Sequence, residues 1–576
     1  MHSVKVGYVA SAVSRALCSS GIHHGELIKV SACCGVRCSV SQTRYYRAAP
    51  APEEGETVIR VPRATQRRVD SVKQTRGQLK VNTIKAGKLL IQSKYPDLNQ
   101  SAAYTHGKFE ELTLCTQGWK HNKSFGDYFS INNVKTVAPF VAEHTHEGDE
   151  QKAPATFHNL RICKPLVEAL DSINITHPTT VQLQTIPKVM KGHNVLCAAE
   201  TGSGKTLSYL LPLVHRLHGD KEESDACAAA GSARKIRAVV LVPSRELAEQ
   251  VAAVSRALCA PLGLKTSTVG GGRGVGHIKM VFKKDHPDVL VATPGALTKA
   301  LRRRCLDLSE LSFFVVDEAD TMFDPSFSDM LADILLHASI ARDPKETRGP
   351  GHKAQLLVVG ATFPGGVGEV LGQVTDLGSL VVIKSKMLHH LMPHVKQSFL
   401  KVRGADKILE LNQALKLLHQ KKGGGGVATL VFCNKSATVN WLGYSLDEMG
   451  VRHARLQGEM PAAVRAGIFR SFQKAGQADV LVCTDIASRG LDTSRVGLVV
   501  NYDAPESHTD YIHRAGRVGR AGGVEDGEVL SFITHPWDVE LVQKIETAAR
   551  RRTSLPGMES DIREPKAKEV EMEAEE

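Results

Sequence analysis

Short apolar runs bounded by polar residues recur along this chain from about residue 157 onward. The first series is NVLCAAE, AVVLVP, DVLVAT, FFVVDEAD and QLLVVGAT; a second, ATLVFCN, HARLQG, DVLVCTD, GLVVNYD and GEVLSFI, follows after about residue 390. The runs are apolar on both faces, and stretches with helical spacing separate them. This pattern predicts buried parallel strands joined by helices, so we expect two successive α/β domains.

The size and composition of the chain limit its class. With 576 residues it is too long for one core, because a domain usually holds about 100 to 200 residues. No apolar run approaches the roughly 18 residues of a membrane-spanning helix, so we expect no membrane insertion. A formal charge of +12 favours a polyanionic partner such as nucleic acid, although a basic surface that serves solubility stays open on charge alone. None of the 12 cysteines forms a CxxC pair, which argues against a zinc ribbon.

The two ends of the chain differ from its middle. Residues 1–47 hold one acid, Glu26, against six Lys and Arg residues. This composition is typical of a mitochondrial targeting segment, although a disordered basic tail would look similar. Residues 48–156 show basic clusters without sustained periodicity, so we expect a basic, largely irregular N-terminal extension. Residues 553–576 are expected to form a short, disordered acidic tail.

A phosphate-binding loop is the strongest chemical signal. The sequence AETGSGKT follows the apolar run NVLCA and precedes the apolar LSYLLPL, which is the strand, loop and helix context that such a loop needs. The glycines let backbone N–H groups turn toward phosphate oxygens, the lysine reaches the β and γ phosphates, and the threonine can bind Mg²⁺. We therefore expect nucleotide binding by Ala199, Glu200, Thr201, Gly202, Ser203, Gly204, Lys205 and Thr206.

A second buried run, FFVV, ends on carboxylates. A phosphate loop needs an acid for the metal at a neighbouring strand end, and Asp317 is the candidate for Mg²⁺. Glu318 is the candidate for orienting and deprotonating the attacking water, because successive residues at a strand end diverge and can take separate tasks. Together with Lys205, these residues predict a hydrolase site.

The order of these motifs resembles that of the DEAD-box ATP-dependent RNA helicases of superfamily 2. AETGSGKT is followed by DEAD at 317–320 and HRAGRVGR at 513–520. The resemblance implies two tandem RecA-like domains, an ATP-binding domain at 157–386 and a C-terminal helicase domain at 387–552. The segment between the two series of apolar runs, SKMLHHLMPHVKQSFL, is the expected linker.

The same resemblance assigns the nucleotide. HPTTVQ is similar to the family's adenine-recognising motif, so Gln182 would read the adenine edge, which implies ATP. Phe157 stands where the family has an isolated upstream aromatic residue, and Asp492 would face the ribose or the γ-phosphate side of the nucleotide. Arg517 and Arg520 would act as arginine fingers that stabilise charge on the transferring phosphoryl group.

Further residues are assigned to RNA and to coupling between motifs by the resemblance. Asp320, Gly360, Thr362 and His513 would connect the motifs to one another. RNA would be held mainly through its backbone, by Arg245, Gly271, Thr293, Gly295, Asn434, Arg465, Thr484 and Gly490.

These motifs predict an RNA-stimulated ATPase that unwinds or remodels structured RNA. They leave the oligomeric state open, and we expect a monomer. GAT at 360–362 replaces the family's usual Ser-Ala-Thr, so a hydroxyl is absent at Gly360. That departure motivates an alternative, an ATP-dependent RNA clamp or assembly chaperone that unwinds little. A non-catalytic RNA-binding protein is a further alternative, which the intact set Lys205, Asp317, Glu318 and Arg517 disfavours.

Three other stretches resemble a vertebrate mitochondrial branch of the family that is associated with the large mitochondrial ribosomal subunit. They are QGWKHNKSFGDYFSI at 117–131, MPHVKQSFL at 392–400 and THPWDVELVQKIE at 534–546. The resemblance implies that mitochondrial ribosomal RNA is the substrate, in the matrix, RNA granules or nucleoid. A nuclear or cytosolic pool stays open, because ARRRT at 549–553 could serve in nuclear import.

Overall fold

The computed structural model describes most of the chain from residue 88 onward. The described residues are 88–133, 156–227, 236–271, 275–282, 287–349, 351–363, 367–385, 388–392, 394–421, 426–476, 478–485, 493–520, 523–524 and 526–555. The predicted targeting segment and residues 556–576 of the predicted tail lie outside this set, as do Gly490 and Asp492.

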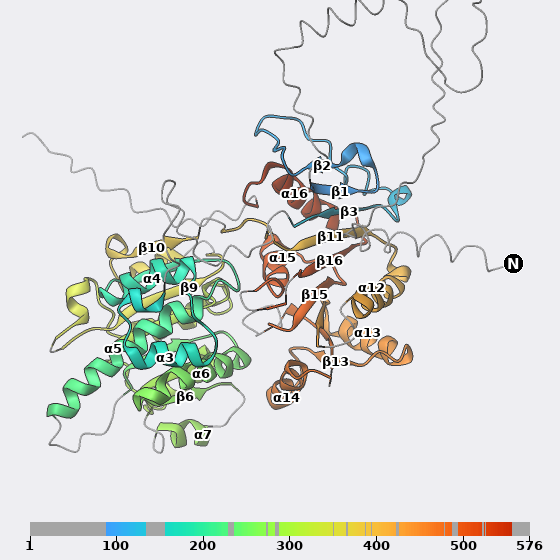
Figure 1. Ribbon diagram of the computed structural model, residues 1–576. Helices are drawn as coiled ribbons and strands as arrows, with labels where there is room; N and C mark the ends of the chain where they lie inside the picture. The colour runs from blue at the N-terminus through green and yellow to red at the C-terminus, as the bar shows by residue number, and fades with distance from the viewer. Residues whose placement is uncertain are drawn as a thin grey trace, which may run out of the picture. The chain divides into compact units, whose positions relative to one another are not determined.

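Residues 157–385, here called the N lobe, contain a seven-stranded sheet whose neighbouring strands all pair in parallel (Figure 1). Its order is β10 (Val381–Lys384), β4 (Val195–Ala198), β9 (Gln355–Gly360), β8 (Phe313–Asp317), β5 (Ala238–Leu241), β7 (Val289–Ala292) and β6 (Thr266–Val269). All five predicted runs are strands. The two edge strands, β10 and β6, are only partly buried and were not predicted. TSTV of β6 lacks an apolar run, whereas VVIK of β10 is mostly apolar.

Helices bury both faces of the N-lobe sheet. Val240 and Val315 pack in the core that contains residues of α4, α5 and α6, whereas their neighbours Val239 and Val316 pack in the core with α8 and α10. This alternation follows from the strand repeat of two and explains why each run is apolar on both faces. The α-helices are α3 (Lys164–Ser172), α4 (Thr180–Met190), α5 (Lys205–Cys227), α6 (Arg245–Cys259), α7 (Val275–Met280), α8 (Pro294–Arg302), α9 (Ala319–Met322), α10 (Ser328–Leu336) and α11 (Val367–Gly372).

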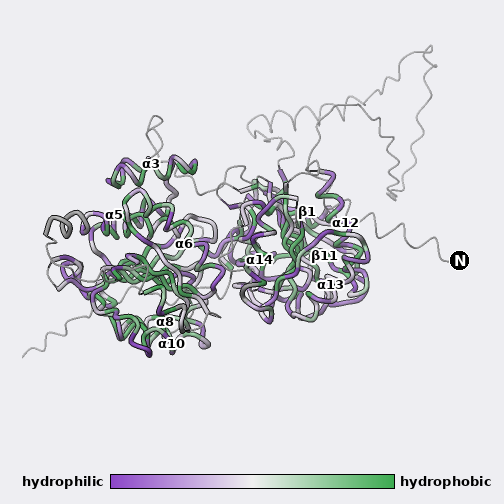
Figure 2. Tube along the Cα trace, turned by 90° about the horizontal axis from the view of Figure 1, so that it is seen from below, coloured by the Kyte–Doolittle hydropathy of each residue, from purple (hydrophilic) through white to green (hydrophobic). Residues whose placement is uncertain are grey.

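The C lobe, residues 394–555 together with 88–133, contains a nine-stranded mixed sheet. Its parallel part has the order β13 (His453–Leu456), β14 (Val480–Cys483), β12 (Ala428–Phe432), β15 (Val496–Asn501), β16 (Glu528–Ile533) and β11 (Lys396–Lys401). The α-helices are α12 (Lys407–Lys421), α13 (Ser436–Glu448), α14 (Ala462–Gln473), α15 (His508–Ala515) and α16 (Asp538–Arg551). In both lobes the hydrophobic segments gather in the sheets, with more polar segments outside them (Figure 2).

The predicted linker requires a correction. Its last residues, from Lys396, form strand β11, which pairs with β16 in the C-lobe sheet. Sequence analysis missed this strand because KQSFLK contains four polar residues and lacks an apolar run.

Residues 88–133 of the extension, which was expected to be largely irregular, include three short strands. They form β1 (Leu89–Ser93), β2 (Gln100–Ser101) and β3 (Tyr128–Ile131), and β3 pairs antiparallel with β11 (Figure 1). The aromatic ring of Phe129 stacks on Phe399 with centroids 4.8 Å apart, and buried Trp119 packs against Phe129. This part of the extension is therefore a component of the C-lobe core.

A buried charge fixes the extension to α16. The carboxylate of Glu546 accepts hydrogen bonds from the backbone N–H of Cys115 at 2.8 Å and from Thr116 Oγ1 at 2.8 Å. It also pairs with Arg550, whose guanidinium donates to the carbonyl of Leu98 at 2.9 Å. Both charged side chains are buried, so each depends on these partners.

Short 3₁₀ helices complete the described structure: η1 (Pro96–Leu98), η2 (Asn122–Ser124), η3 (Phe157–Leu160), η4 (Ala260–Leu262), η6 (Pro344–Thr347), η7 (Leu377–Ser379) and η8 (Gly404–Asp406). Among the helices that the structure describes, none has the length and apolar character needed to cross a membrane.

Candidate nucleotide and RNA site

The predicted phosphate loop joins the carboxyl end of β4 to the first turn of α5. Gly202 and Gly204 have φ angles of 83° and 84°, in the left-handed region that glycine adopts without steric cost. The Nζ atom of Lys205 donates to the carbonyl oxygens of Ala199 at 2.8 Å and Glu200 at 2.9 Å. The loop therefore curls around its own lysine, with the start of α5 supplying backbone N–H groups directed toward an anion.

Gln182 lies directly against this loop. Its Nε2 donates to the carbonyl of Gly204 at 3.0 Å, and its Oε1 accepts from the backbone N–H of Thr179 at 3.0 Å. Thr179 caps α4 and donates to the carbonyl of Ser203, so the helix start and the loop form one unit. Adenine reading by the Gln182 amide remains a prediction. Phe157 is buried in the N-lobe core.

The two predicted catalytic acids occupy the end of β8. Asp317 is buried, and its pKa is raised to about 6 because burial and the neighbouring charge of Glu318 both disfavour its ionised form. Glu318 has φ of 52°, an uncommon conformation for a residue with a side chain and one often found at functional sites. This turn ends the strand and starts α9, so the two carboxylates leave the chain in different directions.

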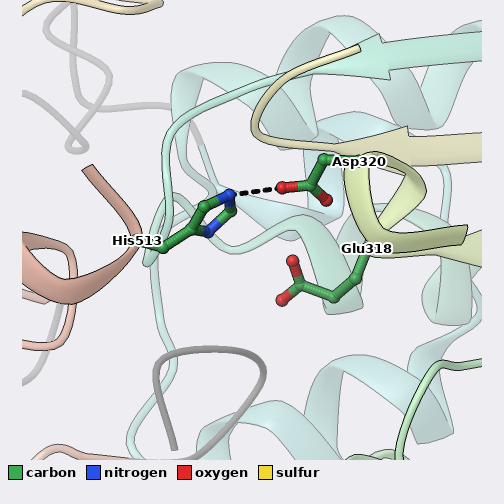
Figure 3. A group of neighbouring side chains, drawn as sticks. All are labelled: Glu318, Asp320 and His513. Atoms are coloured by element: carbon green, nitrogen blue, oxygen red, sulfur yellow. Dashed lines mark ion pairs between the residues drawn. The ribbon is translucent and has the colours of Figure 1, made fainter. Parts of the chain in front are cut away.

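Asp320 connects motifs from three parts of the sequence. Its Oδ2 lies 2.5 Å from Nε2 of His513 on α15 and accepts a 3.5 Å hydrogen bond from Thr362, which follows β9 (Figure 3). Glu318, Asp320 and His513 offer ligand atoms within 4.8 Å of one another. We interpret this group as a polar link, because Asp320 is already engaged by His513 and Thr362 and because Mg²⁺ prefers oxygen ligands.

Gly360 lies beside the same turn. A Cβ atom at this position would lie 3.1 Å from the Cβ of Ala319 and 3.1 Å from the carbonyl of Thr362. The end of β9 thus packs closely against the start of α9.

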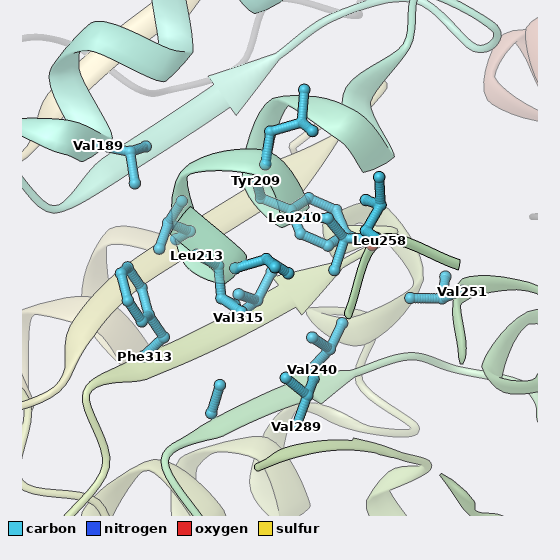
Figure 4. Packing of buried hydrophobic residues seen from close by; sticks show 14 of the residues in the cluster. Val189, Tyr209, Leu210, Leu213, Val240, Val251, Leu258, Val289, Phe313 and Val315 are labelled. Atoms are coloured by element: carbon cyan, nitrogen blue, oxygen red, sulfur yellow. The ribbon is translucent and has the colours of Figure 1, made fainter. Parts of the chain in front are cut away.

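Tyr209 is a residue that the sequence analysis missed. It projects from α5 among the buried residues Leu210, Leu213 and Val315 (Figure 4), and its hydroxyl donates to Asp317 Oδ2 at 2.8 Å. This hydrogen bond lowers the pKa of Asp317 and opposes the effect of burial. A polar-tipped residue in the otherwise apolar helix segment YLLPLV was the available signal.

The predicted arginine fingers follow α15. Arg517 is buried, and its pKa is held well below the ordinary value by burial and by Arg520, while Glu318 and Asp320 act in the opposite direction. The side chain of Arg520 lies next to the phosphate loop, 3.0 Å from the position that a Cβ would take at Gly202. Arg517 therefore lies near the carboxylates of Glu318 and Asp320, and Arg520 lies near the phosphate loop.

Four of the predicted RNA contacts lie at the carboxyl ends of N-lobe strands. Arg245 starts α6 after β5, and its side chain packs on Gly270 after β6. Exposed Gly271 follows Gly270, while Thr293 and Gly295 begin α8 after β7. Carboxyl ends of parallel strands share one sheet edge, so these residues lie along that edge.

The C lobe places Asn434 and Thr484 after β12 and β14, again at strand ends. Asn434 donates to the carbonyl of Ala504 and accepts from Arg514, which also pairs with Asp485 at 2.7 Å. Arg465 donates to the carboxylate of Glu246 on α6 at 2.9 Å. Sequence analysis did not identify Glu246 or Asp485 as partners, because only the fold brings them to these arginines.

Comparisons with known proteins agree with the site. A model of the DEAD/DEAH box helicase family matches residues 179–370, and a model of the helicase conserved C-terminal domain matches residues 407–522. The chain is 49% identical to the Mus musculus protein named probable ATP-dependent RNA helicase DDX28, over 88% of this chain and 93% of that protein. Its identity to the Homo sapiens protein of the same name is 48%, over 89% and 94%.

A solved structure supports the fold. The S. cerevisiae protein Dbp5, bound to RNA and ADP BeF3, matches with a TM-score of 0.54 and 21% identity, covering 69% of this chain and 93% of that chain.

Proposed function

The chain belongs to the DEAD-box family of ATP-dependent RNA helicases, and on this premise we propose that Lys205, Glu318 and Arg517 hydrolyse ATP to bind, unwind or remodel structured RNA. The proposal rests on one observation: the phosphate loop, the acids after β8 and the arginines after α15 converge. A hydrolysis site for a nucleoside triphosphate needs these three components.

The phosphate loop would hold the triphosphate. Backbone N–H groups at Gly202 and Gly204 would bind phosphate oxygens, and Lys205 would exchange its present carbonyl partners for the β and γ phosphates. Gln182 would fix the loop and the adenine together, because its amide already contacts Gly204. Binding of ATP would therefore release Lys205 from these carbonyl oxygens.

The donor set fits Mg²⁺. Asp317 offers a carboxylate and Thr206 a hydroxyl, and this ion prefers oxygen ligands. Burial and Glu318 raise the pKa of Asp317, so a nearby cation would favour its ionised form. When bound, Mg²⁺ would neutralise charge that develops on the phosphates.

Glu318 is suited to act on the attacking water. In the described part of the structure its Oε2 is buried and accepts no hydrogen bond, so this atom is available to take a proton. Arg517 and Arg520 would stabilise charge on the transferring phosphoryl group. Since the acids and the arginines come from different lobes, ATP and RNA that both favour this arrangement would tighten each other's binding.

Replacement of Glu318 tests the proposal. Glu318→Gln keeps the size of the side chain but removes the base, so we expect RNA-stimulated phosphate release to fall by about 10²- to 10⁴-fold while ATP binding is retained. The control is Glu168→Gln, which changes an exposed glutamate of α3 in the same lobe. Near-normal turnover in Glu318→Gln would refute the assignment.

Gly360 supports a second candidate, an RNA clamp or assembly chaperone that unwinds little. A side chain at this position would crowd Ala319 and Thr362, so the hydroxyl that related motifs supply cannot be added here without displacement. Strand displacement measured beside ATP hydrolysis distinguishes the candidates: hydrolysis without displacement supports the clamp.

We further propose that the protein acts on mitochondrial ribosomal RNA during assembly of the large subunit. The composition of residues 1–47 and the three stretches near residues 117, 392 and 534 support this proposal. A fluorescent fusion lacking residues 1–47 should lose mitochondrial localisation, whereas unchanged localisation would contradict the targeting proposal. Cross-linking in cells followed by sequencing of the attached RNA would identify the substrate.

A further inference from the structure

The extension lengthens the edge of the C-lobe sheet that carries predicted RNA contacts. Asn434 and Thr484 follow the carboxyl ends of β12 and β14, and β16 and β11 end at the same edge because these strands are parallel. β3 is antiparallel to β11, so its first residues lie at this edge, and β1 ends there in turn (Figure 1). The edge therefore continues across residues that lie outside the matched helicase regions.

An aromatic and basic cluster occupies this continuation. The ring of Phe125, just before β3, lies under the Nζ of Lys401 at 5.5 Å and the guanidinium of Arg403 at 5.3 Å. Lys401 donates to the carbonyl of Thr534 at 3.0 Å, which joins the ends of β11 and β16. Exposed Arg403 and partly exposed Phe125 thus form one site from segments remote in sequence.

Trp537 adds a second aromatic surface beyond β16. The indole is 70% exposed and stacks on His535 with ring centroids 4.3 Å apart and an interplanar angle of 11°. Stacking on His535 holds the Trp537 ring in place, while most of the ring stays exposed to water. An ordered, exposed aromatic face beside cations is the arrangement on which unpaired bases stack.

A pocket continues the surface on the extension. It has a volume of about 650 Å³ and is lined by Tyr95, Gly118, His121, Asn122, Lys123, Ser124 and Asp127. The Tyr95 side chain is 48% exposed, with Lys94 over its ring at 5.6 Å.

The acids around this surface already have donors. Asp127 accepts from Lys94 and from the Tyr95 hydroxyl, and Asp538 accepts from the backbone N–H of Thr534 and His535. Glu540 pairs with Lys120 at 3.3 Å. Exposed His121, Lys123 and Arg403 are therefore the groups best placed to meet an added anion.

We propose that this surface, which we call the extension face, is a second contact for single-stranded RNA. It consists of Tyr95, His121, Lys123, Phe125, Arg403 and Trp537. The rings stack on unpaired bases and the cations contact phosphates, so binding is tolerant of sequence and dependent on salt. A duplex is excluded as the ligand because its bases are already stacked and paired. The proposal rests on the proposed function in that RNA is the substrate.

The face lies on the same sheet edge as Asn434 and Thr484, so it would hold RNA that extends past the motif-bound segment. A strand long enough to reach both sites should bind more tightly than a short one, since the second contact becomes intramolecular. The extension would in this way retain the protein on RNA that flanks its site of action.

A double variant of the full-length protein tests the extension face. Arg403→Ala with Trp537→Ala removes an exposed arginine and an exposed aromatic ring. The control, Arg455→Ala with Tyr444→Ala, removes an arginine and an exposed aromatic ring elsewhere in the same lobe, where the partly exposed Arg455 lies 4.7 Å over a 63% exposed tyrosine. Affinities are measured for single-stranded RNA of about 10 and about 25 nucleotides. A single-strand binding site commonly covers about 4 to 16 nucleotides, so the shorter RNA can fill one site and the longer RNA can reach a second.

We expect the test variant to lose about tenfold in affinity for the longer RNA and to bind the shorter RNA as the wild type does. The salt dependence of binding to the longer RNA should fall by about one phosphate contact. The control should behave as the wild type. Equal binding of the longer RNA by the test variant and the wild type would overturn the proposal.

Arg403→Glu examines the same surface through charge alone, at an exposed position where a folding defect is not expected. It should weaken binding of the longer RNA at least as much, and failure to do so would also overturn the proposal. Failure of the proposed function is distinguishable, because it would appear as absent ATP hydrolysis by the wild type with the short RNA.

Discussion

The two lobes of this protein differ in whether another strand covers the edge of the parallel sheet. In the N lobe the sheet ends in two short, partly exposed strands, β10 and β6. In the C lobe, β11 lies at the end of the parallel part of the sheet. It is covered by β3, which comes from a segment some 268 residues earlier in the chain. All strands of the N-lobe sheet come from residues 157–385, whereas the C-lobe sheet also includes strands from residues 88–133.

The covering strand changes the environment of β11 completely. Gln397 and Ser398 are buried and find partners in the Tyr511 hydroxyl at 2.6 Å and the Ser130 hydroxyl at 3.0 Å. Ser130 belongs to the extension and Tyr511 to α15, so without the extension Ser398 would lose its partner and the backbone edge of β11 would lose its paired strand. The extension is therefore a structural part of the C lobe, in addition to its proposed role in RNA binding.

Breaking the attachment should have the largest effect. Glu546→Ala leaves Arg550 buried without its carboxylate partner, so we expect a loss of about 3 to 5 kcal/mol in the free energy of unfolding. Glu540→Ala, on the exposed face of the same helix, should change stability by less than about 0.5 kcal/mol. Denaturant unfolding measures both. Equal stability of the two variants would mean that the extension contributes little to the C lobe.

The next largest effect is expected in the N lobe, at the buried carboxylate of Asp317. Tyr209→Phe removes the hydrogen bond that lowers the pKa of Asp317, so that pKa should rise above about 6. Loss of a hydrogen bond to a charged group is worth about 1.5 to 3 kcal/mol. The acid limb of the pH profile of ATP hydrolysis should shift to higher pH. Tyr444→Phe is the control, and an unshifted profile in Tyr209→Phe would exclude this positioning role.

The C lobe holds its own perturbed carboxylate, Glu410 on α12, whose pKa is raised to about 7 by burial and by Asp406. Below about pH 4.5 the group is neutral in both the folded and the unfolded chain. Between pH 4.5 and 7 the unfolded chain ionises first, so this residue makes the folded protein less stable as pH rises.

Glu410→Gln removes that pH-dependent penalty. We expect the variant to gain roughly 1 to 2 kcal/mol over the wild type at pH 8, an amount reduced by solvent screening, and about a quarter of that at pH 5. Thermal unfolding at both pH values measures the difference, with Glu448→Gln at an exposed position as the control. A gain that is the same at pH 5 and pH 8 would contradict the assigned cause.

Gly360→Ser should have the smallest effect. The added Cβ would meet Ala319 and Thr362 at 3.1 Å, so the end of β9 must shift by a few tenths of an ångström. We expect strand separation per ATP hydrolysed to change by no more than about threefold, which is under 1 kcal/mol. A larger gain would show that the glycine limits unwinding.

Much of the fold could be predicted because its signals are local. The runs that form β4, β5, β7, β8 and β9 are apolar on both faces. A glycine-rich loop with lysine and threonine between a strand and a helix is typical of phosphate binding. The same is true of Asp317 and Glu318, whose position at a strand end followed from the adjacent residues. Strands β6 and β11 gave weaker signals, because TSTV and KQSFLK carry polar residues among the apolar ones.

The sequence by itself determined the two α/β lobes, the phosphate loop and the acids that follow β8. Each of these depends on neighbouring residues and on the repeat of a strand or helix. Only the tertiary structure decided that Tyr209 meets Asp317, that His513 meets Asp320 and that residues 88–133 complete the C-lobe sheet. Those contacts join residues far apart in the chain, and no local repeat encodes which remote partner will satisfy a buried polar group or an open strand edge.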